Sequence, residues 1–92
     1  MSNDYNGFKG LNGWVDNTSA YCTWNVCLWV DNHEGTYKSR LNSKPRFGWC
    51  SRTAEEFARK TFGERGTADM REPGYSLDAV NWLEVAEHWN EE

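Results

Sequence analysis

The segment from Thr18 to Asn32 carries apolar residues that satisfy two periodicities at once. A helix places its apolar side chains three or four residues apart, as at Tyr21, Trp24 and Leu28. A strand places them at every second residue, as at Trp24, Val26, Leu28 and Val30. Thr18 or Ser19 supplies a candidate N-cap, which favours the helix. In either form the segment is apolar on nearly every side and is expected to be a central, buried element.

The segment that begins at Thr53 shows the clearest helical pattern of the chain. Thr53 and Glu56 have the spacing of a capping box, and Gly63 supplies a stop signal. Between these signals one face consists of Ala54, Phe57, Ala58, Thr61 and Phe62. The spacing therefore predicts an amphipathic helix that ends before Gly63 and packs on the rest of the domain.

Another amphipathic helix is predicted at the C-terminal end of the chain. A glycine- and proline-containing loop precedes Ser76, which is placed to cap this helix. Its apolar stripe consists of Ala79, Trp82, Val85, Ala86 and Trp89. We expect this stripe to dock on the core.

The middle of the chain carries weaker signals. Tyr37 and Leu41, four residues apart, predict a short helix over residues 36–41. One proline and one glycine then indicate a loop over residues 42–50. The aromatic residues of this loop, Phe47 and Trp49, are expected to anchor it.

Together these elements predict a mostly α fold, a small bundle of three to four helices around a Trp-rich core. The alternative, which follows from the strand periodicity, is an α+β fold with a hairpin near residues 22–39. Residues 1–13 are rich in Asn and Gly and are expected to form a loosely ordered lead-in. Residues 14–92 are expected to form a single globular domain, because so short a chain cannot supply two cores.

Composition makes the core aromatic. Aromatic residues are 15% of the chain, which contains six tryptophans and no isoleucine. Tryptophan and phenylalanine must therefore supply much of the buried area. Four tryptophans are expected to be buried, namely Trp24, Trp29, Trp82 and Trp89.

The cysteines and histidines offer little recognisable chemistry. Cys22, Cys27 and Cys50 are spaced neither as a zinc knuckle nor as a redox pair, and we expect them to be buried as small apolar side chains. No nucleophile signature is present, so no enzymatic activity, metal or cofactor is predicted, and a small metal-stabilised domain is an alternative. The chain begins without a secretory leader and has no apolar run long enough for a membrane span, which favours the cytoplasm.

Charge is distributed unevenly along the sequence. Residues 38–68 contain eight bases and three acids, whereas residues 69–92 contain seven acids and one base. Aromatic residues interleave with the bases of the middle region, a pattern suited to a macromolecular partner or to single-stranded nucleic acid. The predicted partner-binding residues are Lys38, Arg40, Lys44, Arg46 and Arg52.

Two motifs resemble a family of short, uncharacterised proteins encoded by phages and plasmids. Residues 12–14 read NGW and residues 21–30 read YCTWNVCLWV, where the family has N-G-W and approximately Y-E-T-W-N-V-A-L-W-I. Residues 80–87 read VNWLEVAE and are similar to the family's V-D-W-x-E-I-A-E. Cys22 and Asn81 stand where the family has or favours an acid, which puts a carboxylate role at these positions in doubt.

The resemblance implies a genetic context and favours a helix for the first motif. Small proteins in that context often act by occupying a host complex, so the leading hypothesis is a non-enzymatic accessory protein of a phage or mobile element. It would bind and inhibit a host protein or nucleoprotein complex, with anti-CRISPR or another anti-defence activity as the concrete form. The alternative is an accessory factor that binds DNA or RNA directly.

Overall fold

The segment with two competing periodicities is a helix. The fold is that of a computed structural model, which describes residues 7–11 and 18–91. Helix α1 spans Thr18–Asn32, and α2 spans Glu34–Ser43 after a single non-helical residue, His33. The hairpin alternative near residues 22–39 is therefore wrong, because helices rather than a paired strand cover the apolar sides of α1. The short helix predicted over residues 36–41 is confirmed and is longer by two residues at each end.

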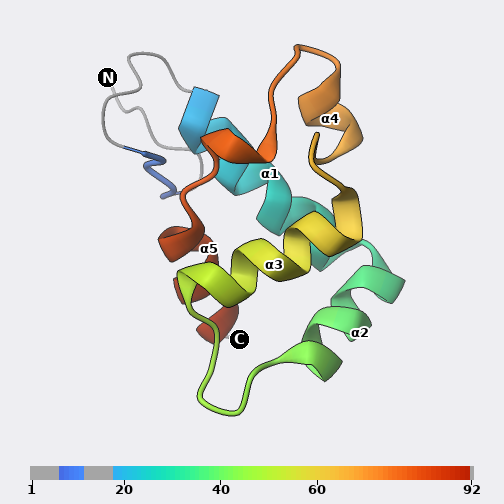
Figure 1. Ribbon diagram of the computed structural model, residues 1–92, viewed down its shortest axis with the longest axis vertical. Coiled ribbons are helices and arrows are strands. Elements are labelled where there is room, and N and C mark those ends of the chain that lie inside the picture. Colours follow the sequence, from blue (N-terminus) through green and yellow to red (C-terminus); the bar gives the residue numbers. More distant parts are fainter. Residues whose placement is uncertain (1–6, 12–17, 92) are drawn as a thin grey trace.

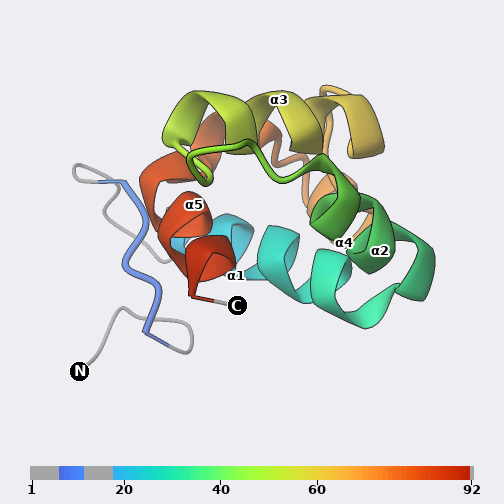
Figure 2. The same ribbon diagram turned by 90° about the horizontal axis from the view of Figure 1, so that it is seen from below.

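Further helices complete the described part of the chain. Helix α3 spans Ser51–Phe62, α4 spans Ala68–Arg71, and α5 spans Trp82–Asn90, with one turn of 3-10 helix, η1, at Leu77–Ala79. Helix α1 contacts α2, α4, η1 and α5, while α3 packs against α5 (Figure 1, Figure 2). The mostly α fold is confirmed, with α1 as its central element.

The aromatic part of the core forms where α3, α5 and the loop before α3 meet. Trp89 is fully buried, and its ring makes edge contacts with Trp49 at 5.0 Å and Phe57 at 5.6 Å between ring centroids. Small side chains fill most of the remaining core, chiefly alanines, valines and two cysteines. The three rings of Trp49, Phe57 and Trp89 therefore form the bulky part of a core that is otherwise built mainly from small side chains.

Burial of the tryptophans differs from expectation at three positions. Trp89 is buried as predicted, whereas Trp24, Trp29 and Trp82 are half-buried. Trp29 shows the reason, because its indole Nε1 donates a hydrogen bond to the exposed side chain of Asp69 at 3.0 Å. An indole at the edge of a core keeps its polar end accessible to such a partner.

The helix predicted from Thr53 corresponds to α3, but the prediction misplaces its N-cap. Cys50, not Thr53, is the N-cap residue, and Thr53 is the third residue of the helix, where its Oγ1 accepts a hydrogen bond from the Cys50 N–H at 2.9 Å. Glu56 therefore lies outside the cap. At the other end Gly63 adopts φ +81°, a left-handed conformation that favours glycine, and the predicted stop is confirmed.

The C-terminal helix begins later than predicted. Ser76 caps only η1, by accepting a hydrogen bond from the Asp78 N–H. The chain then extends at Val80, and Asn81 caps α5 by accepting from the Leu83 and Glu84 N–H groups. Asn81 thus has a structural role at the position where the resembled family often has an acid.

The structure describes residues 7–11 of the predicted lead-in. The rest of the lead-in lies outside the described residues, and so does Trp14, where the ordered domain was expected to begin. The Glu84 carboxylate accepts hydrogen bonds from the backbone N–H groups of Lys9 and Gly10. Asn81 Nδ2 donates to the Gly10 carbonyl oxygen at 2.9 Å. Gly10 is needed here, because a Cβ would lie 2.5 Å from the backbone nitrogen of Ala20.

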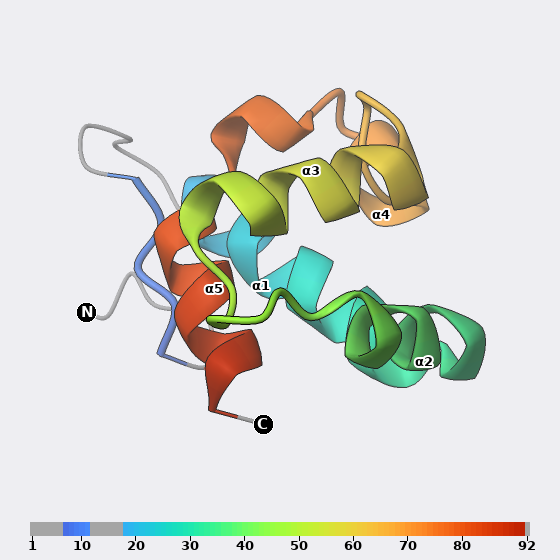
Figure 3. The same cartoon turned by 60° about the horizontal axis from the view of Figure 1, so that its bottom comes forward.

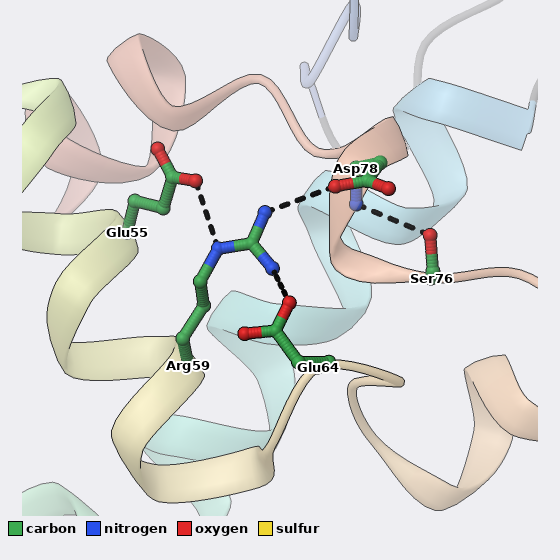
Figure 4. A network of polar contacts seen from close by, with 5 residues as sticks. All are labelled: Glu55, Arg59, Glu64, Ser76 and Asp78. Carbon is green, nitrogen blue, oxygen red and sulfur yellow. Dashed lines mark hydrogen bonds and ion pairs between the residues drawn. The ribbon is translucent and has the colours of Figure 1, made fainter.

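One arginine joins α3 to the segments that follow it. Arg59 pairs with Glu55 at 2.8 Å, Glu64 at 2.6 Å and Asp78 at 3.0 Å (Figure 4). The hydrogen bonds to Glu55 and then Asp78 raise the pKa of the guanidinium. Because one guanidinium pairs with carboxylates of α3, of the segment after it and of η1, this network links η1 to α3.

Candidate interaction surfaces

Arg40 is not at the surface where the sequence predicts a partner contact. Its side chain is 1% exposed, and the guanidinium lies 5.7 Å from the Trp89 ring centroid and 5.0 Å from that of Tyr37. Its Nη2 is 3.8 Å from Asp31 Oδ1. The prediction of Arg40 as a partner contact is therefore corrected: this arginine belongs to the interior, where aromatic rings and a carboxylate balance its charge.

The other four predicted residues are exposed, and two of them have ion-pair partners on their own helices. Lys38 pairs with Glu34 at 3.0 Å, and Arg52 pairs with Glu56 at 3.8 Å, both at i, i+4 spacing. Lys44 and Arg46 lie in the loop between α2 and α3, where no such acid accompanies them in the described part of the chain. Among the predicted partner-binding residues, the positive charge without an ion-pair partner among the described residues therefore lies in this loop.

The same loop exposes an aromatic ring. Phe47 is 94% exposed, and the Arg46 guanidinium carbon lies 5.6 Å from its ring centroid. The expectation that Phe47 anchors the loop is wrong, because Trp49 alone takes the interior position, at 6% exposure. We call Lys44, Arg46 and Phe47 the basic-aromatic tip; its loop projects from the bundle at the lower end of Figure 1.

Hydrogen bonds restrain the loop that carries the basic-aromatic tip. The Gly48 N–H donates to the Pro45 carbonyl oxygen at 3.0 Å, which closes a turn around the tip. On the C-terminal side, Asn90 clamps Trp49 by accepting from its N–H at 2.7 Å and donating to its carbonyl oxygen at 2.8 Å. These bonds restrain the turn and attach its C-terminal side to α5, and the Phe47 ring is presented to solvent beside Arg46.

A pocket of about 420 Å³ lies on another part of the molecule, between α1, α5 and the described lead-in segment. Helix α1 contributes Trp24, Leu28 and Asp31 to its walls, and α5 contributes Glu84, Glu87, His88 and Glu91. Gly7 and Phe8 line it from the lead-in, which runs beside α5 in Figure 3. We call this site the acidic pocket, since its lining contains four carboxylates and no lysine or arginine.

Some groups of the acidic pocket have partners within the chain. His88 Nε2 lies 3.1 Å from Asp31 Oδ2, and the Phe8 ring makes an edge contact with the imidazole at 5.5 Å. Glu84 holds the lead-in through two backbone N–H groups. A histidine beside an aspartate is a pair typical of acid-base sites, but no Ser, Thr, Cys or Lys is among the described residues that line this pocket.

The cysteines divide into two environments. Cys22 and Cys27 are buried as expected, and burial raises the pKa of the Cys22 thiol to about 11. The prediction for Cys50 is wrong, because it is exposed at the start of α3. Its hydrogen bond with Thr53 lowers the pKa of this thiol. Within the described residues, no three His, Cys, Asp or Glu side chains form a group that could hold a metal ion.

No protein-family model, curated protein or solved structure matches this chain. Among the residues that the structure describes, no helix has both the length and the apolar character needed to cross a lipid bilayer.

The sequence pointed to Lys44 and Arg46 of the basic-aromatic tip but not to the exposure of Phe47, and it did not reveal the acidic pocket. The missed signal was the spacing of the acids on α5, where Glu84, Glu87 and Glu91 recur on one face. The sequence could not show that the end of α1, which carries Asp31, lies beside this face.

Proposed function

We propose that this protein is a non-enzymatic binding protein that docks on another protein through the basic-aromatic tip. The observation that carries this proposal is Phe47, a large apolar ring that is 94% exposed beside the Arg46 guanidinium on a hydrogen-bonded loop that also carries Lys44. Aromatic and arginine side chains are the residues that most often dominate the energy of protein interfaces. A rigid loop also loses little conformational entropy on binding.

The small number of exposed, unpaired bases among the predicted contact residues favours a protein partner over DNA or RNA. Nucleic-acid binding needs cations that follow the phosphate backbone, and Lys38 and Arg52 already pair with glutamates. Arg40, the third additional base predicted for this surface, is buried. One cation over an exposed ring, with a second cation in the same loop, matches a small pocket with acidic edges on a protein better than it matches the phosphate backbone of a nucleic acid.

The partner we propose is a host protein or nucleoprotein complex, which the binding inhibits in the cytoplasm of a bacterium. Support for this part comes from the resemblance of the NGW and YCTWNVCLWV motifs to a phage- and plasmid-encoded family. An anti-defence activity, such as inhibition of a CRISPR complex, is its concrete form.

Three tagged proteins test the proposal in a defence-competent bacterial lysate treated with nuclease. They are the unaltered protein, a tip variant with Lys44→Glu, Arg46→Glu and Phe47→Ser, and a control variant with Lys60→Glu and Arg65→Glu, two exposed bases outside the tip. We expect the unaltered protein and the control to capture the same complex and the tip variant to lose it.

Two outcomes contradict the proposal. Equal capture by all three proteins would show that the basic-aromatic tip is not the contact. Capture that disappears with nuclease, together with binding to bare DNA or RNA that weakens steeply with salt, would establish the alternative of direct nucleic-acid binding.

A further inference from the structure

The acidic pocket combines aromatic walls with carboxylates. Its volume of about 420 Å³ lies in the range of small-molecule sites, roughly 300 to 1,000 Å³. Trp24 and Leu28 line it from α1, and Phe8 lines it from the lead-in. Carboxylates from both helices complete the lining, so a ligand inside it meets aromatic side chains and negative charge together.

Three carboxylates of the acidic pocket lie at positions where their negative charge opposes folding. Asp31 is in the last turn of α1, and Glu87 and Glu91 are at the C-terminal end of α5. A helix has a partial negative charge at its C-terminal end, so a carboxylate there is destabilising. Glu87 and Glu91 are also four residues apart on one helix face, where like charges repel.

Partners within the chain compensate only part of this charge. Asp31 has His88 at 3.1 Å and Arg40 of α2 at 3.8 Å, and Glu84 accepts the lead-in N–H groups. Glu87 and Glu91 form no ion pair or side-chain hydrogen bond within the described part of the chain. Two carboxylates at the pocket edge are therefore left to interact with something outside the chain.

We propose that the acidic pocket binds an alkylguanidinium group, the group that an arginine side chain carries. A planar guanidinium stacks on an aromatic face and donates paired hydrogen bonds to carboxylates, and this pocket offers both kinds of contact. An ammonium group is a compact and more strongly hydrated charge that uses the aromatic walls less well. This site is separate from the basic-aromatic tip and does not depend on it.

Titration with butylguanidinium tests the proposal on the full chain. Binding is followed by calorimetry and by the NMR signal of the Trp24 indole N–H, assigned with a Trp24→Phe variant. We expect saturable binding, a shift of that signal, and weaker binding of butylammonium. A blocked Gly-Gly-Arg-Gly-Gly peptide distinguishes the source of the group: tighter binding than butylguanidinium indicates an arginine of a protein, and equal binding indicates a free small molecule.

The matched variants are Glu87→Gln with Glu91→Gln in the pocket, and Glu72→Gln as an exposed control in another part of the chain. We expect the pocket variant to bind at least about tenfold more weakly and the control to bind as the unaltered protein does. Because the pocket change removes charges that oppose folding, the variant remains folded and its binding is measurable. No saturable binding of butylguanidinium, or equal affinity of both variants, would overturn the proposal.

Discussion

Two arginine-aromatic pairs of this protein have the same chemistry and opposite surroundings. Arg40 lies over the Trp89 ring, where both side chains are at most 1% exposed. Arg46 lies over the Phe47 ring at nearly the same distance, where the phenylalanine is 94% exposed. The two arginines are six residues apart, and the sequence predicts the same partner-binding role for both.

The difference shows that the role of a charged or aromatic side chain depends more on the groups around it than on its residue type. Arg40 has its ring and its carboxylate inside the bundle, so its contacts stabilise the fold. The Arg46 and Phe47 pair contacts little besides itself and solvent, so its contact energy is still available to a partner. Four experiments test this distinction, and they are ordered here from the largest expected effect to the smallest.

Truncation of the two rings should give the largest contrast. Trp89→Ala should lower the free energy of unfolding by about 3 to 5 kcal/mol, because it empties a fully buried site shared with Trp49 and Phe57. Phe47→Ala should change it by less than about 0.5 kcal/mol. Urea unfolding followed by circular dichroism measures both. Similar losses in the two variants would contradict the assignment of separate roles.

Substitution of the two arginines should give a smaller contrast. Arg40→Met should cost about 2 kcal/mol, because it removes a desolvated cation-π contact and leaves Asp31 without its arginine partner. Arg46→Met, which removes an exposed guanidinium, should leave the urea midpoint nearly unchanged. If Arg40→Met is as stable as the unaltered protein, the buried arginine is not part of what holds α2 to α1 and α5.

Local signals in the sequence predicted the helices, while burial within them depended on contacts between distant segments. Gly63 ends α3 as predicted because its left-handed backbone is a local requirement. Periodicity could not show that Arg40 meets Trp89, 49 residues away, or that Asn90 secures Trp49 and leaves Phe47 outside. The acidic pocket was missed for the same reason, since its two acidic walls are more than 50 residues apart.

Asp69 tests whether exposure alone decides if a charged residue stabilises the fold or remains available to a partner. It is an exposed residue, yet it accepts hydrogen bonds from Trp29 at 3.0 Å and Asn25 at 3.2 Å, which lower its pKa. A lowered pKa in the folded state means that ionised Asp69 stabilises the protein above the unfolded pKa of about 3.9. This stabilisation is lost as the pH falls through the folded pKa.

We therefore expect Asp69→Asn to be less stable than the unaltered protein at pH 7, by less than the Arg40 change. The gap should close as the pH falls below about 4. Urea midpoints measured from pH 7 to pH 3 provide the test. A gap that does not change with pH would mean that the Asp69 charge makes no contribution to folding.

The smallest expected effect has the opposite sign. Glu87 and Glu91 repel each other at the negative end of α5, so the pair Glu87→Gln and Glu91→Gln should raise the free energy of unfolding by about 0.3 to 1 kcal/mol. Added salt should reduce the gain, because these residues are exposed and their repulsion is screened. Thermal unfolding at low and high salt measures both effects, with Glu72→Gln as the control.

A loss of stability in the pocket variant would mean that Glu87 or Glu91 has a stabilising partner in the folded chain, which would place these acids with Arg40 rather than with Arg46. A gain of stability, combined with loss of butylguanidinium binding, would mean that the acidic pocket and the basic-aromatic tip both carry side chains that serve binding rather than folding. In both places the chain would then carry groups that contribute nothing to its own folding, or that oppose it, because their favourable contacts are made with another molecule.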